Sequence, residues 1–105
     1  MPPVIRIQTW DAAPGKLGEM MALMREAIPI WERSGAQVRI FNNTIAGPAS
    51  TTVSFVSEYP SLSAYGAGTD ALLADPQTQA FVAKVNAAMV GRLVSSTLST
   101  EVARS

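Results

Sequence analysis

The chain has 105 residues, enough for one hydrophobic core and too few for two ordinary domains of ~100 residues each, so we expect a single domain over residues 1–105. Eight Lys and Arg side chains balance eight Asp and Glu side chains, which leaves no long-range positive field to attract nucleic acid or anionic lipid. The sequence contains neither Cys nor His, which excludes disulfides, thiolate nucleophiles, zinc–thiolate sites and a Ser-His-Asp triad. We therefore expect no metal site and no bound cofactor.

The amino-terminal residues enter a strand pattern directly, without a basic stretch and an apolar signal core, and no segment approaches the ~20 apolar residues of a membrane span. These features predict a cytoplasmic protein that binds neither a membrane nor nucleic acid. Apolar residues make up 48% of the chain and charged residues only 15%, a high apolar content for a small domain, which must expose much of its surface. Part of this apolar surface is expected to contact another subunit.

The first predicted element is a strand over residues 4–10, in which apolar and polar side chains alternate. We assign one face, Ile5, Ile7 and Thr9, to the core, and the opposite face, Arg6, Gln8 and Trp10, to the outside of the sheet. Apolar residues at helical spacing then predict a helix over roughly residues 16–34. Pro29 is expected to kink or loosen its last turns, and Gly35 to end it.

Two strands, over residues 37–45 and 51–59, are rich in β-branched and aromatic residues and are predicted to pair antiparallel through a hairpin loop at residues 46–50. A second helix follows Ser61, is interrupted at Asp75, restarts with Pro76 and is expected to end at Gly91. Residues 92–102 predict a final strand. Its facing is left open, since Val94 and Leu98 would point one way and Leu93 the other.

The resulting order, βαββαβ, is typical of an α+β ferredoxin-like sandwich with a four-stranded antiparallel sheet and its helices on one face. The other sheet face is expected to mix aromatic, aliphatic and charged side chains, a composition that suits an interface better than a wetted surface. We therefore predict a homodimer whose sheets meet face to face. The predicted interface residues are Arg6, Gln8, Trp10, Arg39, Phe41, Val56 and Glu58.

The charged members of this set have a second interpretation. Arg6 or Arg39 could hold a carboxylate substrate through the guanidinium fork, whereas the interpretation we favour is that Glu58 neutralises an arginine within the interface.

Three segments give the chain its resemblance to a known group of proteins. They are IPIWERSGA at residues 28–36, SLSAYG at residues 61–66 and LADPQTQA at residues 73–80. On these segments, and over nearly its whole length, the chain resembles the dimeric α/β barrel superfamily, which holds antibiotic-biosynthesis monooxygenases, haem-degrading enzymes, stress-responsive A/B barrel proteins and NIPSNAP-like proteins. The resemblance implies a dimer and a ligand cleft between helices and sheet.

Four residues are candidates to line that cleft: Trp31, Asn42, Phe55 and Tyr65. They would bind a small hydrophobic or aromatic molecule, although aromatic residues at helix or strand spacing more often pack in a core. Acid–base chemistry by Asp11, Glu26 or Glu58 is a further possibility, and solvent exposure of Asp11 and Glu26 is the favoured alternative.

Three functions stay open at this point. The first is small-molecule binding by a dimer without a catalytic set, the second is cofactor-independent oxygenation of a phenol, and the third is a protein-interaction module. The resemblance implies that the oxygenases use an asparagine, a tryptophan and a histidine or arginine around the cleft. This chain has no His, places Tyr65 near the usual tryptophan and offers Arg6 and Gln8 in place of the asparagine, so no catalytic residue is assigned.

Overall fold

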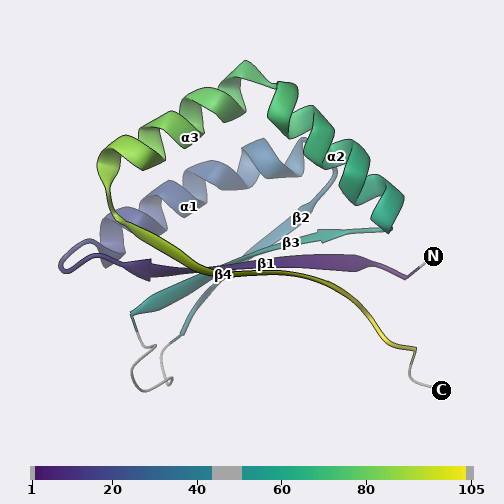
Figure 1. Ribbon diagram of the computed structural model, residues 1–105, viewed down its shortest axis with the longest axis horizontal. Helices are drawn as coiled ribbons and strands as arrows, with labels where there is room; N and C mark the ends of the chain where they lie inside the picture. Colours follow the sequence, from purple (N-terminus) through teal and green to yellow (C-terminus); the bar gives the residue numbers. More distant parts are fainter. Residues whose placement is uncertain (1, 44–50, 104–105) are drawn as a thin grey trace.

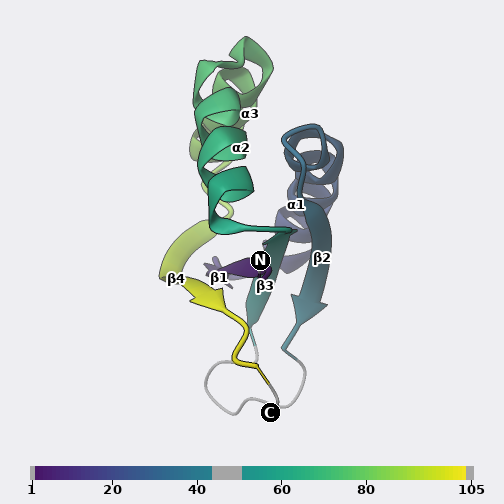
Figure 2. The same cartoon turned by 90° about the vertical axis from the view of Figure 1, so that its right-hand side faces the viewer.

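A computed structural model describes residues 2–43 and 51–103 (Figure 1). Four strands pair antiparallel in the order β2-β3-β1-β4, and the helices lie on one face of this sheet (Figures 1 and 2). The predicted ferredoxin-like α+β fold is confirmed. The elements are β1 (Val4–Ala12), α1 (Leu17–Glu32), β2 (Gln37–Asn42), β3 (Thr52–Tyr59), α2 (Leu62–Ala74), α3 (Pro76–Ala88) and β4 (Gly91–Thr100).

The predicted hairpin loop at residues 46–50, together with the predicted end of the preceding strand at residues 44–45, lies outside the described residues. Within the described ranges, 2–43 and 51–103, no helix is long and apolar enough to cross a membrane.

The broken second helix consists of two helices, each with the N-terminal cap that its sequence predicts. The Ser61 hydroxyl accepts a hydrogen bond from the backbone N–H of Ala64 at 3.1 Å, which begins α2. The Asp75 carboxylate accepts one from the backbone N–H of Gln77 at 2.9 Å, and Pro76 occupies the first position of α3. Because Asp75 has an extended backbone, α2 cannot continue into α3.

Two glycines lie at the ends of helices or strands, and each is required there for a different reason. Gly35 has φ +100°, a conformation that favours glycine, and ends the turn after α1, which runs through Pro29. The prediction that Gly91 ends the second helix was wrong. Met89 makes that turn with φ 51°, while Gly91 begins β4 so close to β1 that a Cβ would collide with the carbonyl oxygen of Asp11.

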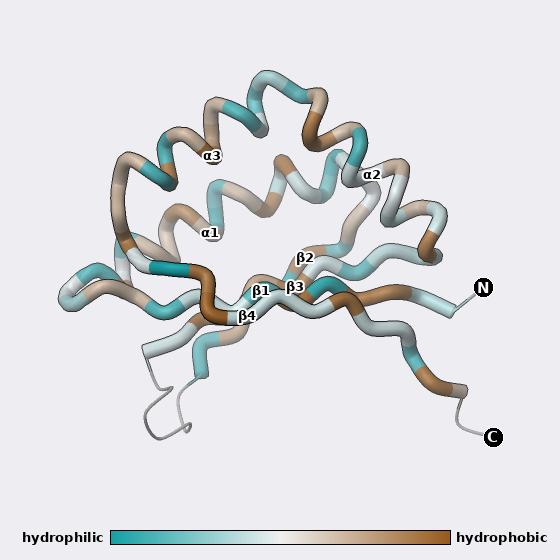
Figure 3. Tube along the Cα trace, viewed as in Figure 1, coloured by the Kyte–Doolittle hydropathy of each residue, from teal (hydrophilic) through white to brown (hydrophobic). Residues whose placement is uncertain are grey.

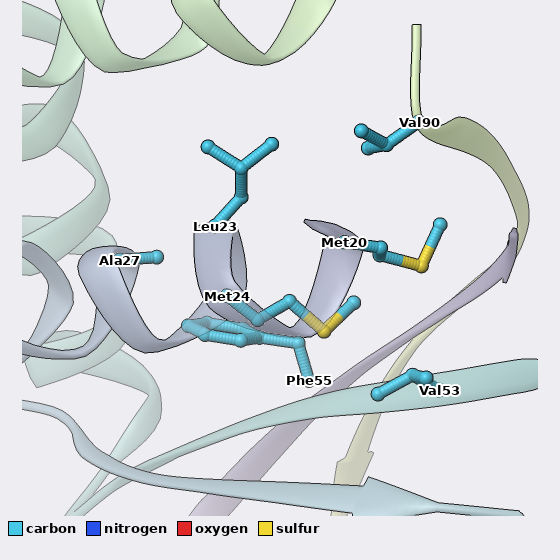
Figure 4. Close-up of a cluster of buried hydrophobic side chains, with 7 residues drawn as sticks. All are labelled: Met20, Leu23, Met24, Ala27, Val53, Phe55 and Val90. Carbon is cyan, nitrogen blue, oxygen red and sulfur yellow. The ribbon is translucent and has the colours of Figure 1, made fainter. Parts of the chain in front are cut away.

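The main core lies between α1 and the sheet. Figure 4 shows side chains from α1 directed both toward β3 and toward the side of α3, so that α1 is the central element of this core. Met24 lies over the ring of Phe55, and Leu23 points away from the sheet. The cluster comprises Met20, Leu23, Met24, Ala27, Val53, Phe55 and Val90.

The face assignment of β1 made from the sequence was wrong. Val4 is 1% exposed in a cluster with Tyr59 on the helix-covered face, and alternation places Arg6, Gln8 and Trp10 on the same face. The uncovered face of β1 instead carries Ile5, Ile7 and Thr9, opposite Glu58, Val56 and Ser54 of β3. Both faces of this strand contain apolar residues. The sequence prediction assumed that the more apolar face packs against the helices, and in β1 the other face does so.

The last strand has a bulge that explains its ambiguous pattern. The register against β1 shifts between Thr9 and Trp10, so that Leu93 lies opposite Trp10 while Leu98 lies opposite Arg6. The extra residue is Val94, and both leucines therefore belong to the helix-covered face. Figure 3 shows a brown apolar segment near the start of β4, after a short teal one, and then the polar stretch that pairs with the middle of β1.

Candidate functional site

A cleft between the helices and the sheet contains two adjoining cavities. The first, the apolar cavity, has a volume of about 80 Å³, and the second, the polar cavity, has a volume of about 160 Å³. Gln8 and Trp31 line both, so these two side chains lie at the passage from one cavity to the other. We call the two together the cleft.

The apolar cavity is formed where α1 and α3 face β1 and β3. Its aromatic rings meet edge to face: the Trp31 centroid lies 5.7 Å from that of Phe55, at 75°, and 6.3 Å from that of Phe81, at 74°. Its remaining lining is Gln8, Trp10, Met20, Leu23, Met24, Ala27, Val85 and Val90. Apart from the tryptophan indoles, Gln8 is the only polar side chain among the described residues of this lining, so the cavity suits an uncharged, apolar group.

The polar cavity is organised around Arg6 of β1. Its Nη1 donates a hydrogen bond to the Tyr65 hydroxyl of α2 at 2.7 Å, and its Nε donates to the Ser96 hydroxyl of β4 at 3.0 Å. The Tyr65 ring packs edge to face on Tyr59, with centroids 5.4 Å apart at 82°. Tyr59 in turn hydrogen-bonds through its hydroxyl to Ser34 at 2.9 Å, so this aromatic pair connects α1, α2 and β3.

Two polar groups in this cavity have bonding capacity that the protein does not use. Arg6 forms no ion pair with any carboxylate in the described residues, 2–43 and 51–103. Thr78, in the first turn of α3, is 6% exposed, and its hydroxyl has no hydrogen-bond partner within those ranges. Unsatisfied buried hydroxyls are rare in folded proteins, because each loses its bonds to water on burial.

The residues predicted to line a ligand cleft separate into two groups. Trp31 and Phe55 line the apolar cavity, and Trp31 also lines the polar cavity with Tyr65. Asn42 lies exposed at the end of β2, beside Val53 of β3, and lines neither cavity.

The carboxylates considered for acid–base chemistry lie outside the two cavities. Glu26 pairs with Lys84 at 2.7 Å, and Glu58 pairs with Arg39 at 2.9 Å on the uncovered sheet face. Asp11 accepts a hydrogen bond from Thr51 at 2.6 Å. Among the residues that the structure describes, no group of three or more acidic side chains is placed to hold a metal ion.

The strand-face prediction placed Arg6, Gln8 and Trp10 away from the cleft, and Thr78 and Phe81 were not predicted as cleft residues. For the three residues of β1, the available signal was Val4, whose apolar side chain alternates in phase with theirs. For the last two, the signal was helical spacing, because Thr78, Phe81 and Val85 recur on one face of α3.

The chain is similar to known proteins both in its fold and in its sequence. The fold, with three helices over one face of a four-stranded antiparallel sheet, matches that of solved dimeric α/β barrel structures. Residues 5–103 match the model of the NIPSNAP family, and the chain belongs to that family. No match is found among curated proteins.

Similar solved structures include NIPSNAP proteins and an oxygenase. A NIPSNAP family protein of unknown function from Agrobacterium tumefaciens has a TM-score of 0.80 at 16% identity, covering 99% of this chain and 92% of that one. An uncharacterized NIPSNAP domain protein from Burkholderia xenovorans has a TM-score of 0.74 at 22% identity, covering 95% and 93%. SnoaB, a cofactor-independent oxygenase from Streptomyces nogalater, has a TM-score of 0.67 at 12% identity, covering 100% and 96%.

Proposed function

We propose that this NIPSNAP protein binds a small hydrophobic or aromatic molecule in the cleft between its helices and its sheet. The observation that supports this most strongly is the apolar cavity, where Trp10, Trp31, Phe55 and Phe81 come together from β1, α1, β3 and α3. A concave site lined by aromatic rings and opening beside a few polar groups is the usual form of a small-molecule site. An aromatic ring in this cavity would gain edge-to-face contacts of the kind that Trp31 already makes.

We also propose that two copies assemble through the sheet face that the helices leave uncovered. On this face Ile5, Ile7 and Val56 adjoin the ion pair between Arg39 and Glu58. Apolar side chains around a neutralised charge pair have the composition of an interface. Phe41, 49% exposed at the β2 edge of the same face, extends the apolar part. Arg6, Gln8 and Trp10 are removed from the proposed sheet-face interface, because they face the helices.

The ligand proposal is tested by titrating the protein with 3-phenylpropionamide, a neutral molecule with one aromatic ring, and following tryptophan fluorescence. Both tryptophans of the chain line the apolar cavity, so a ring that enters it changes the environment of both. The expected result is a saturable change with one site per chain. A linear response without saturation contradicts the proposal.

A matched pair of variants on α1 assigns the signal to the cavity. Ala27 is buried and lines the apolar cavity, and Ala22 is exposed on the same helix. Ala27→Leu fills part of the space and is expected to weaken binding at least tenfold, while Ala22→Leu changes the side chain identically without touching the cavity. Equal affinities of the two variants would place the ligand elsewhere.

A second candidate function is cofactor-independent oxygenation of a phenol. It is favoured by the fold shared with SnoaB and by Arg6, whose positive charge would stabilise a bound phenolate. None of the described residues that line the cleft carries a carboxylate, so the described lining offers no carboxylate base to take the proton of the phenol. Oxygen uptake with a naphthalenediol, compared between the protein and its Arg6→Met variant, tests this candidate. Uptake equal to the protein-free rate would reject it.

A further inference from the structure

We propose that the cleft selects an anion: an apolar or aromatic molecule that bears a carboxylate, with its apolar body in the apolar cavity and its carboxylate bound by Arg6, Tyr65 and Thr78. This inference rests on the proposed ligand-binding function and adds the chemical class of the ligand. It assigns a function to the polar cavity, which the proposal of an apolar ligand leaves unexplained.

The first argument is the charge of the cleft. Among the residues that the structure describes, Arg6 is the only charged one that lines either the polar or the apolar cavity. It forms no ion pair with a carboxylate within residues 2–43 and 51–103. Arg6 is only partly exposed, and a charge that is partly withdrawn from water without an opposite charge costs free energy, which an anionic ligand would recover. A carboxylate bound there would meet no acidic side chain among the described lining residues to repel it.

The second argument is the number of donors that Arg6 retains. A guanidinium has five N–H donors in a planar fork, and within the described residues two of them are used, from Nε to Ser96 and from Nη1 to Tyr65. These two bonds fix the plane of the guanidinium, because they hold it from β4 on one side and from α2 on the other. The remaining donors, both on Nη2 and one on Nη1, are therefore pre-oriented for a carboxylate.

The third argument is the direction in which Tyr65 donates. Its hydroxyl oxygen accepts the bond from Arg6, and an arginine cannot accept one in return. The hydroxyl proton is therefore left to donate to another acceptor. No acceptor for it is found in the described part of the chain, and Tyr65 lines the polar cavity with Arg6. The hydroxyl thus supplies a second donor to a carboxylate bound by the arginine.

The fourth argument is the unpartnered hydroxyl of Thr78. It belongs to a side chain that is more than nine-tenths buried, lines the same cavity and finds no partner in residues 2–43 or 51–103. A ligand oxygen would satisfy it. Thr78 comes from α3, whereas Arg6 and Tyr65 come from β1 and α2, so the three groups surround the cavity from different elements.

The ligand's shape follows from how the cavities adjoin. Gln8 and Trp31 line both, so a molecule can pass between them with a ring on one side and a carboxylate on the other. The apolar cavity, at about 80 Å³, is too small to hold several fused rings. A simple probe with these properties is 3-phenylpropionate, in which a flexible two-carbon link joins a phenyl ring to a carboxylate.

The experiment compares 3-phenylpropionate with 3-phenylpropionamide by the same tryptophan fluorescence titration. The two probes have nearly the same size and shape and differ at one end, where the amide replaces a charged carboxylate with a neutral group that has an NH2 in place of one oxygen. A charge-assisted hydrogen bond contributes about 1.5–3 kcal/mol, so the wild-type protein is expected to bind the carboxylate roughly tenfold to hundredfold more tightly than the amide. Arg6→Met, which keeps a side chain of similar length, is expected to abolish this preference and to leave amide affinity within about threefold.

Arg25→Met is the matched control. It removes one positive charge from an exposed position on α1 that lines neither cavity, and it is expected to keep the full preference for the carboxylate. Tyr65→Phe, which removes one oxygen atom and retains the ring packed on Tyr59, gives an independent test even where Arg6→Met fails to fold. It is expected to reduce the preference about threefold to tenfold.

The outcomes separate this inference from the function on which it rests. Equal binding of the two probes to the wild-type protein overturns anion selectivity and leaves the apolar ligand site standing. An unchanged preference in Tyr65→Phe or in Arg6→Met also overturns it. Saturable binding of neither probe overturns both proposals.

Discussion

The close approach of α2 to the rest of the protein at Gly68 supports a quantitative prediction. A Cβ added there would lie 2.5 Å from the carbonyl oxygen of Ser34 and 2.8 Å from Cε2 of Tyr59. The first of these atoms belongs to the backbone at the end of α1 and cannot move aside alone. Gly68→Ala must therefore displace α2, and with it Tyr65, from the wall of the polar cavity.

Gly66 is the matched control two residues earlier in the same helix. A Cβ at Gly66 would meet nothing within 4 Å. Both substitutions gain the same helix propensity, roughly 0.5–1 kcal/mol, because alanine loses less backbone entropy than glycine. Only Gly68→Ala also incurs the cost of overpacking, about 1–3 kcal/mol. Gly66→Ala is expected to raise the free energy of unfolding above that of the wild-type protein. The free energy of unfolding of Gly68→Ala is expected to be lower than that of Gly66→Ala by the overpacking cost.

Urea unfolding followed by circular dichroism measures this difference directly. The midpoint for Gly66→Ala should exceed that of the wild-type protein, and the midpoint for Gly68→Ala should lie below that of Gly66→Ala, with equal slopes for all three proteins. Equal free energies of unfolding for the two variants would refute the close approach of α2 to Ser34 and Tyr59.

Three further changes have expected outcomes. Ile7→Glu puts a charge on the uncovered sheet face and is expected to raise the dimer dissociation constant at least ~100-fold in sedimentation equilibrium, because a charge buried without a partner costs several kcal/mol. The control is Leu62→Glu at an exposed position on α2, which should leave the dimer dissociation constant unchanged. Thr78→Val removes the unpartnered hydroxyl and is expected to raise the free energy of unfolding by about 1 kcal/mol, and a loss of stability would show that the hydroxyl has a partner. Asp75→Ala removes the cap of α3 and is expected to cost about 1 kcal/mol in urea unfolding, whereas no change would mean that Pro76 alone starts the helix.

Much of the fold was predictable because its elements have strong local signals. Ser61 and Asp75 begin helices through side-chain bonds to nearby backbone groups, which depend on only a few neighbouring residues. Gly35 ends a turn for an equally local reason, its positive φ. Signals of this kind can be read from a single sequence because no distant contact has to be known.

The facing of the strands depended on contacts that the sequence does not reveal. In β1, both Val4 and Ile5 are apolar, and only the position of the helices decides which of them is buried in the monomer. In β4, the bulge at Val94 reverses the alternation, and its cause is the pairing with β1. The same error of facing assigned Arg6 to the outer surface, although it is the main polar group of the cleft.

The candidate site was predictable in part of its aromatic lining and not in its polar part. Trp31, Phe55 and Tyr65 stood out by size and spacing, and all three line the cleft. Thr78 has no distinguishing sequence feature beyond its helical spacing to Phe81, because its significance is a missing hydrogen bond that only coordinates can show.

The most direct test of ligand binding in the cleft is a heteronuclear NMR titration of nitrogen-labelled protein with 3-phenylpropionamide, observed at the side-chain indole signals. The chain has two tryptophans, and both line the apolar cavity. Binding in the cleft predicts that both indole signals shift and reach saturation together at one ligand per chain, and that Ala27→Leu prevents the shifts at the same ligand concentration. Indole signals that stay in place while other resonances saturate would contradict the account, because the ligand would then bind outside the cleft.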